Sequence, residues 1–310
     1  MSPENERGQA FVLTVLAITV LLGMTALVLD VGAWFRTKRQ LQATADAAAL
    51  AGAQKLPADP TSAKTLALNY ADQNGGGVLG DDITVESSQS ANDTIFVKAK
   101  KQDSGFFSRL FDVDVVDVGA SAKARIGLPS QVRYAAPMVV SCEHEYIHHC
   151  DEPDPLPDIP SPETTLSFDP MGAPGAFGML NFSGDSGTLG ASEEATWIRQ
   201  GYDAWLDVPK YYRSDPGAKF ASGGNVQAAL NFRQNSVLLF PVFKPPLLGQ
   251  GQNAQYWIIG WIGFRLDSYD VQGHSATLTG HFTEFLAQGI LSRSGSAAPN
   301  FGVKSIELIG

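Results

Sequence analysis

The 310-residue chain has a formal net charge of −10, with 44% hydrophobic and only 17% charged residues. An acidic surface repels phosphate backbones, which argues against nucleic-acid binding. The 31 glycines and 18 prolines favour a turn-rich body with many strands over a mainly helical one.

Residues 10–29 contain no charged side chain. About 20 residues with a rise of ~1.5 Å each span the ~30 Å hydrocarbon core of a bilayer. The apolar region of a cleaved signal peptide is shorter, roughly 7–15 residues. We therefore predict a cytoplasmic N-terminus at residues 1–9 and a retained transmembrane helix at residues 10–31.

Basic residues follow this helix at Arg36, Lys38 and Arg39, and by charge alone they favour the cytoplasmic side. Long domains, however, translocate largely regardless of such charges. We expect a single-pass protein of the cell membrane, with a cytoplasmic N-terminus and an extracytoplasmic C-terminal domain.

Residues 32–57 are rich in alanine, a strong helix former, and predict an amphipathic stalk helix ended by Pro57. Two interpretations are open: a simple stalk, or a surface on which partner helices pack and through which the chain forms oligomers. Small residues at helical spacing let another helix approach closely, and an acidic residue at the membrane edge either pairs with a basic group of a partner or lies among the headgroups. The residues of this candidate surface are Asp30, Leu41, Ala45, Ala48 and Gly52.

Taken in order, these segments resemble the N-terminal module of TadG-like (TadE/TadG-type) proteins of the Flp/Tad pilus-assembly system. The resemblance rests on Arg7-Gly8-Gln9-Ala10, Leu29-Asp30-Val31-Gly32, Arg39-Gln40-Leu41-Gln42 and Ala45-Asp46-Ala47-Ala48-Ala49-Leu50-Ala51-Gly52-Ala53. Residues 81–126 and, more weakly, 237–282 are similar to later parts of such proteins.

The resemblance implies a non-enzymatic role in assembling or attaching an adhesive pilus in the bacterial envelope, with other pilus-assembly or envelope proteins as partners. Prepilin-like relatives are cut after a glycine and carry a glutamate five residues beyond it. Counted from Gly8 that position is Leu13, which argues against processing. The chain has no Asp-x-Ser-x-Ser string, so the metal site of a von Willebrand A domain is not expected.

The remaining chain predicts an α+β fold. We expect a small α+β domain at residues 58–127, with a helix at 61–74 capped by Thr61 and strands at 83–85, 94–97 and 113–124. A Cys/His loop and a proline-rich linker occupy 128–163, and a β-rich extracytoplasmic domain occupies 164–310. Its expected elements are helices starting at Ser192 and spanning 225–232, and strands at 236–243, 255–266, 275–285 and 303–309.

Potentially metal-binding side chains are most concentrated between Cys142 and Cys150. This run also contains His144, His148 and His149. A disulfide closing this short loop suits an extracytoplasmic domain and leaves the histidines exposed. The alternative is a zinc or copper site made by the same five residues, although such sites usually draw ligands from two separate segments.

Two other patterns carry less weight. The string Gly184-Asp185-Ser186-Gly187 matches the nucleophile region of trypsin-like proteases, but no histidine lies in a triad context, so we interpret it as a turn. Trp257, Trp261 and Phe264 could line a sugar site, but their alternating apolar strand favours core positions.

We expect no enzyme activity and no cofactor. The alternatives are a membrane-tethered hydrolase and an anchored metal- or carbohydrate-binding module.

Overall fold

The computed structural model describes residues 3–309 except 106, 148–149, 151–158, 172, 186–187, 218, 273–274 and 293–298. It divides into two compact units, residues 1–125 with 308–310, and residues 126–307. The fold is α+β as expected, with a long apolar helix first and a β-rich distal part. Each unit is described by itself.

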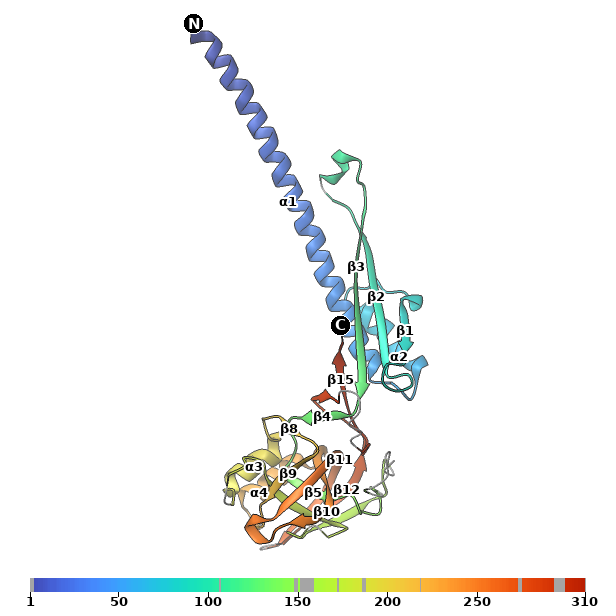
Figure 1. Ribbon diagram of the computed structural model, residues 1–310, viewed down its shortest axis with the longest axis vertical. Coiled ribbons are helices and arrows are strands. Elements are labelled where there is room, and N and C mark those ends of the chain that lie inside the picture. Colours follow the sequence, from blue (N-terminus) through green and yellow to red (C-terminus); the bar gives the residue numbers. More distant parts are fainter. Residues whose placement is uncertain are drawn as a thin grey trace. The chain divides into compact units, whose positions relative to one another are not determined.

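The first unit is built on α1, a single helix that spans Pro3–Ala53 (Figure 1). The expected membrane helix and the alanine-rich stalk are therefore continuous, and 51 residues give a length of about 75 Å. No proline interrupts the helix after its first residue, and alanine and leucine favour it throughout its length. The helix ends before Pro57.

Helix α2 spans Pro60–Gln73 and packs against the C-terminal part of α1. Its N-cap is Asp59, whose carboxylate accepts the Ser62 backbone N–H at 2.9 Å. The expected cap, Thr61, instead lies inside the first turn, because Pro60 takes the first helical position.

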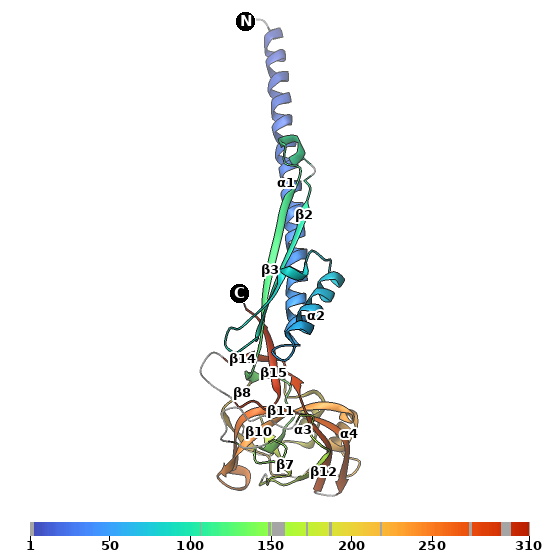
Figure 2. The same ribbon diagram turned by 90° about the vertical axis from the view of Figure 1, so that its right-hand side faces the viewer.

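The expected strands of this unit form an antiparallel sheet in the order β1-β2-β3. The elements are η1 Gly80–Asp82, β1 Ile83–Glu86, β2 Thr94–Asp103, η2 Ser108–Phe111 and β3 Val116–Gly127. The β2–β3 hairpin is long, paired from Thr94 opposite Arg125 to Asp103 opposite Val116. It lies alongside α1 in two perpendicular views (Figures 1 and 2). Near its open end, Ile309 donates its backbone N–H to the Lys123 carbonyl at 2.9 Å.

The second unit centres on a seven-stranded mixed sheet in the order β10-β5-β7-β6-β12-β11-β9. Strand β10 also pairs with β11, and β7 also pairs with β9, so the sheet closes on itself. The strands are β5 Met138–Ser141, β6 Thr164–Phe168, β7 Ala176–Asn181, β9 Lys210–Ser214, β10 Ser236–Leu248, β11 Gln255–Gln272 and β12 Ser275–Thr283.

Both faces of this sheet are covered, which explains the continuous apolar run of β11. One buried cluster contains Val140, Phe240 and Phe264; a second contains Val139 and Leu239, which point to the opposite face.

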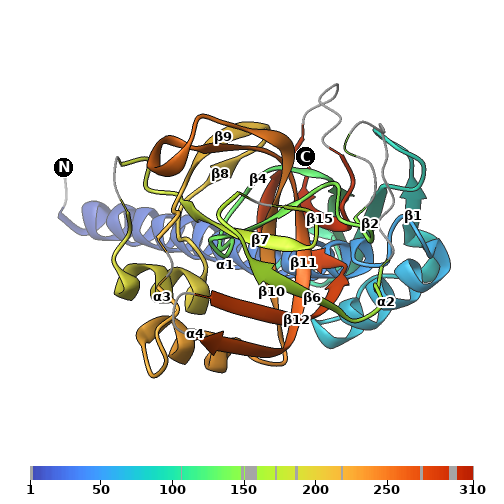
Figure 3. The same ribbon diagram turned by 90° about the horizontal axis from the view of Figure 1, so that it is seen from below.

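Two helices complete the first of these clusters. They are α3, Ala191–Gln200, and α4, Asn225–Arg233, and they lie side by side (Figure 3). The N-cap of α3 is Gly190, and no side chain bonds the end of the helix. The expected cap, Ser192, is inside the helix, where its carbonyl accepts the Thr196 hydroxyl.

Short strands form a second, three-stranded sheet in the order β14-β4-β8. They are β4 Pro129–Val132, β8 Leu206–Asp207 and β14 Gly289–Leu291. Strands β13 Phe285–Leu286 and β15 Val303–Leu308 pair in parallel, and η3 Gly251–Asn253 joins β10 to β11. The expected strand at residues 275–285 is thus split into β12 and β13.

Candidate functional site

The N-terminal part of α1 exposes a nearly unbroken apolar surface. Its most apolar 18-residue window has a mean hydropathy of 2.6 and is only 6% buried. Hydrocarbon accommodates such a surface, whereas water does not. The exposed side chains are Phe11, Val12, Leu13, Val15, Leu16, Ile18, Val20, Leu21, Leu22, Met24, Leu27, Val28 and Leu29. This helix is the one candidate membrane span in the described part of the chain.

The few polar side chains in this stretch are satisfied within the helix. The hydroxyls of Thr14, Thr19 and Thr25 each donate to the backbone carbonyl four residues earlier, at 2.8 to 2.9 Å. An unsatisfied hydroxyl would be costly in hydrocarbon, so these bonds make the segment compatible with a bilayer.

Asp30 ends the apolar stretch and is only 4% exposed. Its Oδ2 accepts the backbone N–H groups of Phe107, at 2.9 Å, and Ser108, at 2.7 Å. Both residues lie at the tip of the β2–β3 hairpin, where η2 begins. The carboxylate therefore fastens the hairpin tip to α1 by charge-assisted hydrogen bonds within the chain.

A second set of hydrogen bonds joins α1, beyond Asp30, to the other elements of the first unit. The Thr37 hydroxyl donates to Asp103 Oδ2 at 2.5 Å, where β2 ends. The buried Thr44 hydroxyl donates to the carbonyl of Asn74, the C-cap of α2, at 2.6 Å. The C-terminal half of α1 is therefore packed into the first unit, against β2 and α2.

The small-residue face of α1 packs within the chain. Leu41, Ala45 and Ala48 are 3%, 0% and 0% exposed, and Gly52 is also buried. The facing residues on α2 are Ala63, Ala67 and Ala71. The sequence correctly indicates close helix packing here, but in this structure α2 and β2 of the same chain occupy the surface that was expected to receive a partner helix.

Gly52 lies where α1, α2 and β2 meet. A Cβ atom at this position would lie 2.6 Å from Ile95 Cδ1 and 2.9 Å from the Ala63 carbonyl oxygen. No side chain fits at such distances without a shift of the backbone.

An exposed surface of α1 remains just beyond Asp30. Phe35 is 62% exposed, and a hollow between α1 and β3 is lined by Val31, Trp34, Phe35, Lys38, Asp117, Val118 and Gly119. The lining is mainly apolar, with one cation and one anion.

In the second unit, Cys142 and Cys150 form a disulfide, with Cα atoms 5.2 Å apart. Cys142 is fully buried and donates its backbone N–H to the carbonyl of Phe243 in β10 at 3.0 Å. With both sulfurs used, neither is a thiolate available to a metal ion in this structure.

His144 does not lie on the loop surface as expected. It is 2% exposed and contacts Phe282 edge-on, with ring centroids 5.0 Å apart. Its Nδ1 accepts the Tyr146 backbone N–H at 3.2 Å. Burial lowers the pKa of His144, while the nearby Glu145 raises it. The imidazole of His144 is therefore buried and neutral. His148 and His149, the other members of the alternative metal set, lie outside the described residues.

The remaining sequence candidates fall in the core or outside the described residues. Trp261 and Phe264 are 3% and 0% exposed, and Trp257 contacts the ring of Tyr211 in a tilted arrangement with centroids 4.5 Å apart. Two of the three aromatics are therefore unavailable to a sugar. Ser186, from the protease-like string, lies outside the described residues.

The comparison with protein families bears on α1. Residues 8–55 match the family model described as "Putative Flp pilus-assembly TadE/G-like". This match confirms the resemblance of the N-terminal module, and it covers α1 from the start of its apolar stretch to its end. No curated protein and no solved structure matched the chain.

Proposed function

We propose that this chain is a non-enzymatic, membrane-anchored component of Flp/Tad-type pilus assembly or envelope attachment, which acts through protein–protein contacts. The observation that carries the proposal is the exposed apolar half of α1 inside the segment that matches the TadE/G-like model. A helix with this surface anchors the chain, and the folded units that follow remain free to bind partners.

The proposed topology places the N-terminus in the cytoplasm and both folded units outside it. The disulfide supports this orientation, because disulfides persist in oxidising compartments and are rare in the cytosol. Oxidation of these cysteines in the cytoplasm would be difficult to maintain.

A labelling experiment tests the topology. Cys142 is fully buried, so the native cysteines are poor reporters, whereas Leu79 is 71% exposed. Leu79→Cys should react with a membrane-impermeant maleimide in intact spheroplasts, and Asn5→Cys should react only after lysis. The reverse pattern would overturn the proposed orientation.

For partner contacts we propose the exposed surface of α1 beyond Asp30 in place of the small-residue face. That face is occupied by α2, whereas Phe35 and the apolar hollow beside it are accessible. Because this surface directly follows the apolar stretch, another membrane-anchored protein of the same system could reach it.

Photo-crosslinking in cells tests this contact. A photoreactive residue at Phe35 should capture a second membrane-anchored pilus-assembly protein. The same residue at Tyr70, on the outer side of α2 and 41% exposed, is the matched control. Deletion of the gene should abolish surface pili and adhesion. Unchanged pili would refute the assembly role, and equal capture at both positions would refute the surface.

A further inference from the structure

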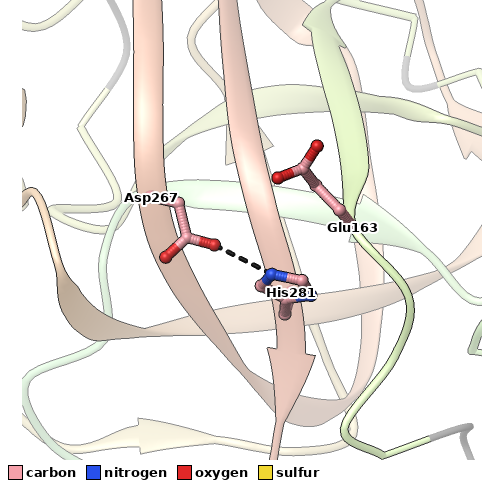
Figure 4. A group of neighbouring side chains, drawn as sticks. All are labelled: Glu163, Asp267 and His281. Carbon is pink, nitrogen blue, oxygen red and sulfur yellow. Dashed lines mark ion pairs between the residues drawn. The ribbon is translucent and has the colours of Figure 1, made fainter.

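Three ligand-type side chains from distant parts of the sequence meet on the second unit. Glu163 immediately precedes β6, His281 lies in β12 and Asp267 lies in β11, which are consecutive strands of the sheet (Figure 4). One potential ligand atom from each residue lies within 4.8 Å of the others.

The strand register explains two of the three positions. Thr164 pairs with Gly280, so the preceding residue, Glu163, comes beside His281 on the neighbouring strand. Side chains at alternate positions of β12 point to opposite faces, and Phe282 enters the core while His281 points outward.

The third position follows from the alternation of β11 next to a β-bulge. The pairing of β11 with β12 shifts between Leu266 and Ser268, so Asp267 is the extra residue. Bulges re-aim side chains, and here Asp267 Oδ2 comes to 3.0 Å from His281 Nε2. Regular alternation along β11 also places Asp267 on the same outward face as Arg265, the residue that pairs with His281.

The hydrogen bond at Nδ1 of His281 leaves Nε2 as the ring nitrogen that can bind a metal ion. Nδ1 lies 3.0 Å from the Ser161 carbonyl oxygen, which can only accept, so Nδ1 carries a proton. In a neutral imidazole, Nε2 then presents a lone pair, yet it faces a carboxylate oxygen. A metal cation bound to both Nε2 and this oxygen removes the repulsion between them. A backbone carbonyl on one ring nitrogen is the usual way in which a metal-binding histidine is oriented.

The surrounding charges also favour a cation. Arg265 Nε lies 3.1 Å from Asp267 Oδ1, which leaves Oδ2 directed at His281. Two carboxylates against one guanidinium give these side chains a net negative charge, which attracts a cation. The exposed Glu163 carboxylate can close on the pair by a rotamer change.

We propose that Glu163, Asp267 and His281 form a surface site for a divalent transition-metal ion, with Zn²⁺ as the best match. One imidazole nitrogen and two carboxylate oxygens are ligands that zinc accepts, whereas Ca²⁺ prefers oxygen alone. Three protein ligands leave a coordination position open to water or to a side chain of another protein. The site uses no residue of the Cys142–Cys150 loop, and it does not rest on the proposed role in pilus assembly.

Metal titration of the full chain tests the site. Tag-free protein in detergent micelles is stripped with a chelator, and Zn²⁺ binding is measured by competition with a chromophoric chelator, with Co²⁺ absorption as a second readout. We expect one equivalent in the wild type and at least a tenfold weaker affinity in both Glu163→Gln and Asp267→Asn. Glu284→Gln, an exposed carboxylate just beyond β12, is the matched control and should leave the affinity unchanged.

Because Glu163 is exposed, its substitution should not disturb folding. Absence of stoichiometric binding in the wild type would overturn the proposal. So would unchanged affinity in both site variants, or loss of binding in His148→Gln/His149→Gln with retention in Glu163→Gln.

Discussion

Glu194 in α3 is the buried group whose titration should most affect the stability of the second unit. It is 1% exposed, and neither carboxyl oxygen has a hydrogen-bond partner among the described residues. Lys219 Nζ lies 3.8 Å from Glu194 Oε2 but only 2.6 Å from Asp215 Oδ2, so the lysine is paired mainly with Asp215. Burial raises the pKa of Glu194 to about 8; Lys219 opposes this shift and Asp215 adds to it.

The direction of the pH effect follows from proton counting. A glutamate in the unfolded chain has a pKa near 4.5, so between pH 4.5 and pH 8 the folded protein binds the extra proton. The stabilisation is fully present below pH 4.5 and is lost as the pH rises to about 8. The slope is about 1.4 kcal/mol per pH unit, which gives a loss of about 3 kcal/mol between roughly pH 5.5 and 7.5.

Glu194→Gln isolates this effect, because glutamine has the same shape and does not titrate. The free energy of unfolding is measured by urea titration of the full chain in micelles, followed by tryptophan fluorescence; Trp197 lies in the same helix. Relative to the wild type, the variant should gain about 1.4 kcal/mol per pH unit over this interval. Glu193→Gln, at the exposed neighbouring position, should show no such gain. Parallel pH profiles for the wild type and Glu194→Gln would refute the argument.

Three further changes test contacts inside each unit, two in the first unit and one in the second. Gly52→Val should lower the free energy of unfolding by about 1–3 kcal/mol through overpacking, as seen by thermal unfolding; Gly32→Val, which has open space around its Cβ, should cost much less. Asp30→Asn removes a charge-assisted acceptor and should accelerate amide hydrogen exchange at the tip of the β2–β3 hairpin, and unchanged exchange there would contradict the role of this carboxylate. Replacing Cys142 and Cys150 together by alanine should cost about 2.5 kcal/mol in a urea titration, since the bond closes a short loop; an unaltered midpoint would show that the loop is held by its other contacts.

The sequence alone was sufficient for features that depend on local composition. A run of twenty uncharged, mostly apolar residues specifies a candidate membrane helix wherever it occurs, and the alanine-rich stretch after it specifies more helix. Helix α2, strands β10 and β11 and the start of β2 were predicted for the same reason, because each carries a local period or a continuous apolar run. The errors at Thr61 and Ser192 lie at helix starts, where Pro60 and Gly190 move the boundary by one or two residues.

The structure decided everything that depends on partners distant in the sequence. The alanine face of α1 predicts close packing, but only the fold shows that α2 of the same chain fills it. Short strands such as β5 and β6 have too few residues for a period, and the closure of the sheet depends on the pairing of β10 with β11. The group of Glu163, Asp267 and His281 spans more than 100 residues and depends on the register of three strands, because a shift of one residue in register turns a side chain to the other face. Local pattern therefore specified the elements, whereas long-range pairing specified which side chains meet.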